Sequence, residues 1–424
     1  MKVCIAGMGK IGVPLAVQFG VKGARVTGYD ISAERCAEIN AGRNPLPTEP
    51  GLNEAMPGLV AIGHLRATTD ARDAAADADV ALFIVPVDIG DDQQPDFETL
   101  DAAVEALAPH LKPGVLVIVE TTVPVGTTRF RVLPKIGAGG AGRDFSLAFS
   151  PERVSSGTVL EDLRRYPKIV GGVNATSTER AAAFYAQMLD AEILPVCDAE
   201  TAEFSKLAET TYRDVNIALA NEFARLGDGL GIDTLQAIAA ANTQPYSHIH
   251  APGPGVGGHC IPVYPHFLAA PQTPGMEALE TELVSKARRI NDGMAQYAID
   301  QLAAGMGGLD GATVVVLGLA YRAGVKEARH SSAFGLAAAL TAGGARVFVH
   351  DPLFSAEEIR AVGLEPPPSW PTACDALVVQ AWHEEYRELE LASFEGLRAV
   401  LDTRAALDQA TVRGLGMVYV GIGR

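Results

Sequence analysis

The sequence predicts an α/β protein in which two doubly wound units are joined by a long central helix and a helical dimerisation region. Short apolar runs alternate with amphipathic stretches over residues 2–170 and again over residues 312–401, a pattern typical of strands and helices in a mostly parallel sheet. Between these stretches, apolar side chains recur at helical spacing over residues 198–226. We therefore expect three domains, at residues 1–197, 198–304 and 305–424.

Length, charge and cysteine usage limit the classes of function. The chain has 424 residues, which exceeds a usual single domain, and its 48% hydrophobic and 20% charged residues exclude a disordered chain or a coiled coil. The formal net charge of -17 disfavours nucleic-acid binding and attachment to acidic membranes. Five cysteines without a CxxC pair argue against a disulfide scaffold or a zinc site. With no signal peptide and no apolar run of membrane length, we expect a cytoplasmic protein.

The first 30 residues predict a dinucleotide site. Residues 2–6 and 25–29 are the expected strands, and GMGKIG at residues 7–12 lets the backbone approach a pyrophosphate at a helix N-terminus, as in a Rossmann-like domain. Asp30, at the end of the second strand, suits the two hydroxyls of an adenosine ribose and would repel a 2′-phosphate. The pattern favours NAD over NADP; the alternative is a merely structural glycine turn.

The remaining elements follow in order. In the first unit, a helix is expected at residues 97–111 and strands at residues 80–85, 115–119, 146–149 and 168–170. Asp198 is the expected N-cap of a central helix of about 28 residues, or about 42 Å. Helices at 234–241 and 279–302 come next, separated by a segment, 252–258, too rich in Gly and Pro for regular structure. The second unit has an expected helix at 334–340 and expected strands at residues 312–318, 346–350, 376–380 and 399–401, without the glycine fingerprint.

Three side chains are candidates for chemistry. Cys260 lies in a glycine-rich loop, where backbone amides can lower the pKa of a thiol; the alternative is a buried cysteine in a tight turn. Lys206 lies on the central helix, where its position alone predicts a surface lysine. Glu152 follows a strand, and its position alone indicates no function. Cys36 is expected in a helix, and buried structural roles are expected for the other cysteines, Cys4, Cys197 and Cys374.

Taken together, the motifs resemble the UDP-glucose/GDP-mannose dehydrogenase family from end to end. They are GMG at 7–9, ETTVPVG at 120–126, SPER at 150–153, KLAETTYRDVN at 206–216, GPGVGGHCIP at 253–262, GLAYR at 318–322 and DTR at 402–404. The GPGVGGHCIP form is similar to the branch that acts on UDP-N-acetylhexosamines.

The resemblance implies oxidation of the C6 hydroxymethyl of a nucleotide sugar to a carboxylate in two NAD-dependent steps, through an aldehyde and a thioester. It implies that Cys260 is the nucleophile, that Lys206 stabilises oxyanions, and that Glu152 with Thr122 positions the hydrolytic water, with Thr210 one helical turn after the lysine. The implied cofactor-binding residues are Gly7, Gly9, Lys10, Ile11, Gly12, Asp30, Arg35, Pro86, Thr122, Arg329 and Arg404. The implied substrate-binding residues are Glu152, Arg153, Lys206, Tyr246, Gly257, Cys260, Tyr321 and Arg322.

Several positions depart from the family pattern near this site. Tyr264 replaces the usual Asp four residues after the cysteine, Thr210 replaces an Asn, and Tyr246 stands where an Arg is common. These departures suggest an altered substrate preference. The histidines between residues 248 and 266 lack a carboxylate partner in the sequence, and we expect no metal site.

Three functions remain open at this stage. The first is a 6-dehydrogenase of a UDP-N-acetylhexosamine such as UDP-GlcNAc or UDP-ManNAc; the second is the same reaction on UDP-glucose or another nucleotide sugar. The third is a weakly active homologue that binds NAD and a nucleotide sugar as a sensor or assembly partner. The central helix carries a second apolar edge, and family members pair through this element, so we expect a homodimer; the edge consists of Ala208, Tyr212, Val215 and Leu219.

Overall fold

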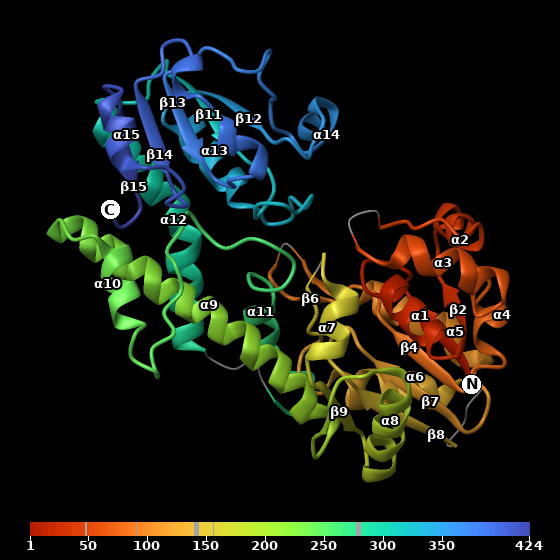
Figure 1. Cartoon of the computed structure of the whole chain (residues 1–424). Coiled ribbons are helices and arrows are strands. Elements are labelled where there is room, and N and C mark those ends of the chain that lie inside the picture. The colour runs from red at the N-terminus through yellow and green to blue at the C-terminus, as the bar shows by residue number, and fades with distance from the viewer. Residues whose placement is uncertain (47–48, 91, 140–143, 156, 277–280) are drawn as a thin grey trace. The chain divides into compact units, whose positions relative to one another are not determined.

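The computed structural model describes residues 1–46, 49–90, 92–139, 144–155, 157–276 and 281–424. The chain folds into two compact units (Figure 1). The first unit contains Met1–Glu209 and His266–Glu280, and the second contains Thr210–Pro265 and Thr281–Arg424. The predicted division into three domains stays a prediction.

An eight-stranded sheet in the order β10-β9-β8-β7-β4-β1-β2-β3 forms the centre of the first unit. Neighbouring strands are parallel except for β8 and β9, which are antiparallel with Phe149 opposite Gly171. A separate short antiparallel pair is formed by β5 (Asp88–Ile89) and β6 (Pro95–Asp96). The strands are β1 Lys2–Ala6, β2 Arg25–Tyr29, β3 Leu65–Thr68, β4 Val80–Phe83, β7 Val115–Val119, β8 Phe145–Phe149, β9 Lys168–Gly172 and β10 Ile193–Pro195.

Helices supply the rest of the first unit's core. Helix α1 is buried over nearly its whole length, and its Phe19 ring meets Phe184 of α8 edge-on at 5.3 Å between centroids. The side chain of Asn174 caps α8 by accepting a hydrogen bond from the Ser177 N–H. The helices are α1 Gly12–Val21, α2 Ala33–Asn40, α3 Leu52–Ala61, α4 Ala71–Ala75, α5 Glu98–Leu107, α6 Leu133–Ala138, α7 Val159–Arg165 and α8 Ala175–Met188, with a 3-10 turn at Ala108–His110 and a π-helix at Thr127–Val132.

The second unit contains a five-stranded parallel sheet in the order β12-β11-β13-β14-β15. Its core lies between this sheet and the helices α12 and α13, and α12 ends at Gly307, whose φ of 75° ends the helix in the left-handed conformation. The elements are α10 Thr234–Ala241, α12 Glu282–Met306, β11 Thr313–Leu317, α13 Ser332–Ala342, β12 Arg346–His350, α14 Ala356–Ala361, β13 Ala376–Val379, β14 Ala399–Asp402, α15 Gln409–Gly414 and β15 Val418–Gly421, with 3-10 turns at Glu384–Glu388 and Leu391–Ser393.

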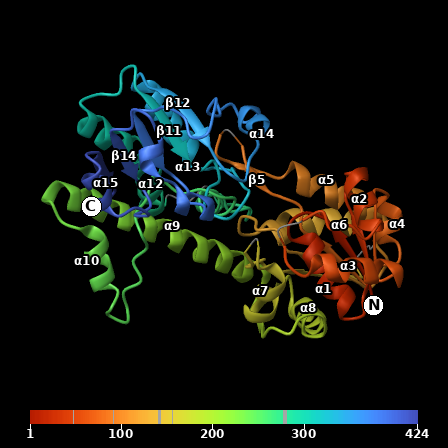
Figure 2. The same cartoon turned by 45° about the horizontal axis from the view of Figure 1, so that its top comes forward.

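Helix α9 (Ala199–Leu230) contributes its first part to the first unit and the remainder to the second. The helix has 32 residues. Its ribbon is unbroken in both views (Figures 1 and 2). The side chain of Asp198 accepts a hydrogen bond from the Thr201 N–H at 2.8 Å, so the predicted N-cap is confirmed. The short helix α11 (Tyr264–Ala269) follows the Cys260 loop.

The predicted fold class is confirmed, while several boundaries differ from the expectation. The expected strand at 80–85 ends at Phe83, and Ile84 and Val85 leave the ladder ahead of Pro86. The expected helix at 97–111 ends at Leu107 and closes in a 3-10 turn that contains a proline. The start of the expected helix at 279–302 falls partly outside the described residues, and the helix runs on to Met306.

Candidate active site

The glycine turn after β1 is built for close backbone approach. Gly7 has a φ of 95°, which favours glycine, and a Cβ on Gly12 would lie 1.9 Å from the Gly7 carbonyl oxygen. A Cβ on Gly9 would meet only a guanidinium nitrogen of Arg35, at 4.0 Å, so open space faces this residue. Lys10 is exposed and Ile11 is partly buried in the same turn.

Asp30 and the start of α1 complete a binding site that fits NAD. The Asp30 carboxylate accepts hydrogen bonds from the N–H groups of Met8 and Ser32, both at 2.9 Å, and its half-buried oxygens keep lone pairs for hydroxyl groups. Helix α1 has no side-chain cap and no acidic residue in its first turn, which leaves its amides available to a pyrophosphate. Arg35 lies beside this turn and donates a hydrogen bond to the Met8 carbonyl at 3.3 Å.

The carboxyl ends of β4, β7 and β8 carry further predicted residues. Pro86 is exposed after β4, and Thr122 is buried after β7. After β8, Glu152 Oε1 accepts hydrogen bonds from the N–H groups of Arg153 (2.6 Å) and Val154 (3.0 Å). These residues come from neighbouring parallel strands, so they share one edge of the sheet, where α/β proteins bind their ligands.

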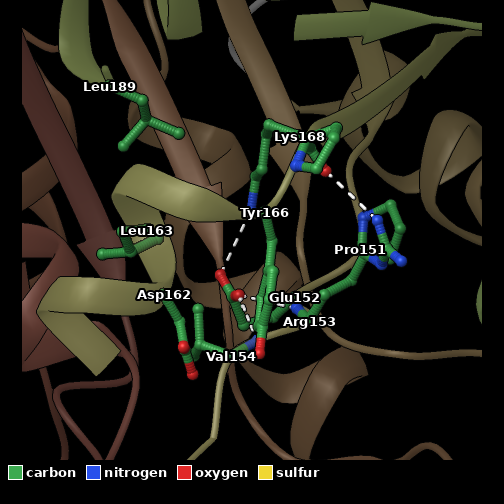
Figure 3. A pocket seen from close by; sticks show the side chains of 10 residues that line it. Pro151, Glu152, Arg153, Val154, Asp162, Leu163, Tyr166, Lys168 and Leu189 are labelled. Atoms are coloured by element: carbon green, nitrogen blue, oxygen red, sulfur yellow. Dashed lines mark hydrogen bonds and ion pairs between the residues drawn. The ribbon is translucent and has the colours of Figure 1, made fainter. Parts of the chain in front are cut away.

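Glu152 borders a small cavity of about 10 Å3, roughly the space of one water (Figure 3). Lys168, the first residue of β9, places its Nζ 3.2 Å from Glu152 Oε2. Arg153 pairs with Glu209 at 2.8 Å and donates a hydrogen bond to the Pro167 carbonyl at 3.3 Å, which ties the SPER segment to α9 and to the start of β9.

The sequence reasoning missed two charged groups next to Glu152. Lys168 Nζ also lies 2.7 Å from Glu120 Oε1, and Tyr185 of α8 donates a hydrogen bond to the same Glu120 oxygen. Glu120 is the first residue of the ETTVPVG motif and Lys168 the first residue of an expected strand, and neither was expected to take part in the site. A charged residue in an otherwise apolar strand was the available signal, because Lys and Glu are rarely buried unless they are paired.

Lys206 and Thr210 lie one turn apart on α9, and both are buried, with 7% and 2% of their surfaces exposed. The reading of Lys206 as a surface lysine is therefore wrong.

The loop that carries Cys260 packs against the segment after β11 within the second unit. Gly258 has a φ of 97° and donates its N–H to the Arg329 carbonyl at 3.0 Å. A Cβ on Gly257 would lie 2.7 Å from the Cβ of Tyr321, so only glycine permits this approach. Cys260 itself is partly exposed, as a nucleophile requires.

Arginines surround this loop. Arg322 donates a hydrogen bond from Nε to the Tyr321 hydroxyl at 3.0 Å. Arg329 Nη1 lies 3.3 Å from Nδ1 of His259, whose Nε2 lies 2.7 Å from Glu327. Arg404 donates a hydrogen bond to the Gln380 carbonyl at 2.6 Å, and its Nη1 would lie 2.9 Å from a Cβ on Gly253. The loop thus has cationic side chains close to both of its ends.

A buried amide chain fixes the start of the same loop, and the sequence reasoning gave it no role. Gly253 donates its N–H to Asn221 Oδ1 at 2.8 Å, and Asn221 donates to Asn291 Oδ1 at 2.9 Å. Asn291 in turn donates to Asp214 Oδ1 at 2.8 Å, and Arg288 pairs with Asp214. Asp214 and Asn221 project from α9 and Asn291 from α12, so the two helices hold Gly253 together.

The predicted substrate residue Tyr246 is 89% exposed.

The remaining cysteines differ in burial. Cys4, Cys36 and Cys374 are buried, and burial raises the pKa of Cys4 and of Cys374 to about 12. The predicted burial of Cys197 is wrong: its thiol is exposed in the turn between β10 and α9, 3.0 Å from the Thr201 hydroxyl. Within the described residues, no three His, Cys, Asp or Glu side chains gather as a metal site.

Comparison with known proteins identifies the family. Residues 1–189 match the NAD binding domain of the UDP-glucose/GDP-mannose dehydrogenase family, residues 200–293 its central domain and residues 315–409 its UDP binding domain. The chain belongs to the UDP-glucose/GDP-mannose dehydrogenase family. This confirms the resemblance drawn from the motifs. The protein is an NAD-dependent nucleotide-sugar dehydrogenase.

Relatives of this dehydrogenase cover its whole length. The UDP-N-acetyl-D-mannosamine dehydrogenase of Pyrococcus horikoshii is 33% identical, covering 100% of this chain and 99% of the relative. The NDP-N-acetyl-D-galactosaminuronic acid dehydrogenase of Ralstonia nicotianae is 33% identical over 95% of each chain. A solved structure of the UDP-D-ManNAc dehydrogenase of P. horikoshii superposes with a TM-score of 0.88 at 32% identity, covering 100% and 99% of the two chains. No helix in the described part of this dehydrogenase is long and apolar enough to cross a membrane.

Proposed function

We propose that this dehydrogenase oxidises the C6 hydroxymethyl of a UDP-N-acetylhexosamine to the carboxylate, in a four-electron reaction that passes through a thioester on Cys260 in the cytoplasm. The partly exposed Cys260 carries the proposal, because a simple alcohol dehydrogenase needs no thiol in a glycine-rich loop beside an arginine-rich segment. The names of the full-length relatives and the GPGVGGHCIP loop support an N-acetylated sugar.

The proposed chemistry divides between side chains of both units. NAD, when bound, supplies the hydride acceptor for each oxidation. Addition of the Cys260 thiolate to an aldehyde gives a hemithioacetal, whose oxidation leaves a thioester. Lys206, with Thr210 one turn along α9, stabilises the negative charge that develops on oxygen. Glu152 and Thr122 position the water, which opens the thioester when its oxygen bonds to the carbonyl carbon and the C–S bond breaks.

Binding roles follow the same division. The turn at residues 7–12, Asp30, Arg35, Pro86 and Thr122 hold the cofactor in the first unit, with Arg329 and Arg404 as cofactor contacts from the second. Since a diphosphate is dianionic and the whole chain has a net charge of -17, local arginines are needed to attract it. We assign the nucleotide sugar to Glu152, Arg153, Lys206, Tyr246, Gly257, Cys260, Tyr321 and Arg322.

A UDP-N-acetylgalactosamine is a second candidate substrate, since the name of the Ralstonia relative contains N-acetyl-D-galactosaminuronic acid. Tyr264 and Tyr246, which depart from the family pattern, both belong to the second unit, together with the proposed sugar contacts Gly257, Cys260, Tyr321 and Arg322. A preference between C2 and C4 epimers would therefore reside in this unit.

We also propose a homodimer that pairs through α9 and α10. Exposed apolar side chains and a groove of about 270 Å3 lie along these two helices within the second unit. Leu226 is 59% and Leu230 71% exposed there. Apolar surface of this kind on a helix face marks an interaction site, and a second copy would cover it.

The substrate proposal is tested by NADH formation on a panel of UDP-GlcNAc, UDP-ManNAc, UDP-GalNAc and UDP-glucose. Turnover with an N-acetylhexosamine at least tenfold above that with UDP-glucose supports the proposal. Equal or faster turnover of UDP-glucose contradicts the assignment of the sugar. Tight binding of NAD and sugar without turnover of any member would instead support a sensor.

A further inference from the structure

Four side chains from different parts of the first unit meet at the carboxyl edge of its sheet. Glu120 follows β7, Glu152 follows β8, Lys168 begins β9 and Tyr185 lies on α8; we call them the Glu120 cluster. Lys168 Nζ lies 2.7 Å from Glu120 Oε1, 3.2 Å from Glu152 Oε2 and 5.0 Å from the centre of the Tyr185 ring. The three N–H groups of the ammonium therefore have two carboxylates and one aromatic face as partners.

The burial of this cluster limits the charge that it can hold. The side chains of Glu120, Lys168 and Glu152 are 0%, 5% and 12% exposed. Two ionised carboxylates around one ammonium would leave a net negative charge in a buried site, and an uncompensated buried charge costs several kcal/mol. One proton on either carboxyl group brings the cluster to neutrality.

The environments of the two carboxyl groups favour the proton on Glu120. Burial alone would raise the pKa of Glu152, but the Lys168 charge and the N–H groups of Arg153 and Val154 outweigh burial and lower it. Burial raises the pKa of Glu120, and the charge of Lys168 does not offset it. Both oxygens of Glu152 accept hydrogen bonds, whereas Glu120 is bound through Oε1 alone and its Oε2 has no hydrogen-bond partner among the described residues. Glu152 therefore has more donors to stabilise a negative charge.

Other charged and titratable groups near Glu152 are engaged elsewhere. Arg153 pairs with Glu209 of α9 at 2.8 Å. Asp162 of α7 accepts hydrogen bonds from the Ser155 N–H and the Thr158 hydroxyl, and Tyr166 lines the cavity beside it. Lys168, by contrast, pairs directly with the Glu152 carboxylate, at 3.2 Å.

We propose that Glu120 and Lys168 are positioning residues for Glu152: Glu120 holds the proton that balances the cluster, so the Lys168 ammonium is left to keep Glu152 ionised and fixed in orientation. This inference rests on the proposed function, in which water opens the Cys260 thioester. Glu152 Oε2 keeps a lone pair beyond its bond to Lys168 and takes one proton from that water. The water oxygen bonds to the thioester carbon, the C–S bond breaks, and its electron pair leaves on the Cys260 sulfur.

The first test measures the pKa of Glu152 in the protein without substrate, by carbon NMR of labelled glutamate carboxyl groups, assigned with Glu152→Gln. Removal of a neighbouring opposite charge in Lys168→Met should raise this pKa by about 1–3 units. Lys168→Arg keeps the charge and should restore most of the original value. An unchanged pKa in a folded Lys168→Met variant overturns the role of Lys168.

The second test locates the proton by infrared difference spectra at neutral pH. The wild type minus Glu120→Gln should show the carbonyl stretch of a protonated carboxyl group, and the wild type minus Glu152→Gln should show a carboxylate band instead. The reverse pattern overturns the proposal. If Lys168→Met does not fold, the infrared test still decides which carboxyl group holds the proton. Its two variants should fold, because Gln has nearly the shape of a protonated Glu.

A third measurement separates this inference from the proposed function. In Lys168→Met, the acid limb of the pH profile for thioester hydrolysis should move upward with the pKa of Glu152, while the KM for the nucleotide sugar changes less than kcat. If the wild type is active but the acid limb of Lys168→Met does not move, the positioning role is overturned and the proposed function still stands. A wild type that forms no sugar acid defeats the proposed function, and the NMR and infrared results then still decide the state of the Glu120 cluster.

Discussion

The ammonium of Lys168 lies 3.2 Å from a carboxylate oxygen of Glu152, across the antiparallel pair β8 and β9. Phe149 of β8 is opposite Gly171 of β9, and continuing this register brings Lys168 opposite Glu152. Because β9 runs against its neighbour, its amino end lies at the edge where β7 and β8 end. The reversed direction of β9, which β10 shares, thereby places a cation at the ligand-binding edge formed by the other strands.

Two glycines of the GMGKIG turn should respond differently to alanine. In Gly12→Ala the new Cβ would lie 1.9 Å from the Gly7 carbonyl oxygen, so we expect about 3 kcal/mol or more of destabilisation. Gly9→Ala meets only a guanidinium nitrogen at 4.0 Å, so the protein should keep its stability but lose NAD affinity at least about tenfold. Urea unfolding and NAD titration check both. Equal loss of stability in the two variants would contradict this reading of the turn.

The glycine turn, the Asp30 position and the Cys260 loop could be predicted because each is a local pattern in the sequence. The link between Lys168 and Glu120 could not, because it depends on the strand order and on the reversed direction of β9, which no short motif specifies. The burial of Lys206 was likewise missed, since the helical spacing of α9 does not tell which of its faces another segment covers. Nor do the apolar neighbours of Cys197 reveal that this turn is exposed.

The amide chain that holds Gly253 should control the reactivity of Cys260. Asn221→Ala leaves the buried Gly253 N–H without its partner, which costs about 1–3 kcal/mol and frees the start of the loop. We expect kcat to fall about tenfold and the alkylation rate of Cys260 in the substrate-free protein to change. The variant Asn216→Ala serves as a control. Asn216 binds the His248 carbonyl and the His250 N–H, which lie further from Cys260 in the sequence than Gly253 does, so this variant should change the alkylation rate less. An unchanged alkylation rate in Asn221→Ala would refute this role.

His350 should make the protein less stable in mild acid. Its Nδ1 lies 2.9 Å from the Tyr386 hydroxyl and its ring stacks on Trp370 at 3.5 Å, and burial, aided by His383, lowers its pKa from 6.5 to about 4. In the unfolded chain His350 binds a proton below pH 6.5, whereas in the folded chain it stays neutral until about pH 4. Stability from this group is therefore full above pH 6.5 and falls between these values, by at most about 3 kcal/mol.

Substitution His350→Phe keeps an aromatic ring for the stack and removes the titration. The difference in unfolding free energy between pH 7 and pH 4.5 should then shrink relative to the wild type, although the variant loses the hydrogen bond to Tyr386. Urea unfolding at a series of pH values measures this difference. The same pH dependence in both proteins would show that His350 does not carry the acid sensitivity.

The proposed pairing through α9 and α10 predicts that Leu226→Asp gives a monomer. Leu226 is 59% exposed, so a charge there costs the folded monomer little but would be buried without a partner in a dimer. Leu415→Asp places the same charge at a 50% exposed leucine after α15 and should leave the assembly intact. Sedimentation velocity at micromolar concentration distinguishes the two, and a monomeric wild type would end the proposal.

The number of NADH molecules formed per sugar oxidised tests the covalent mechanism most directly. The wild type should form two NADH per molecule of sugar acid, and no free aldehyde should accumulate. Cys260→Ser should stop the second oxidation, because a serine hydroxyl is largely protonated at neutral pH and forms its ester poorly. One NADH per sugar with free aldehyde as the end product of the wild type, or full acid formation by Cys260→Ser, would contradict the thioester on Cys260.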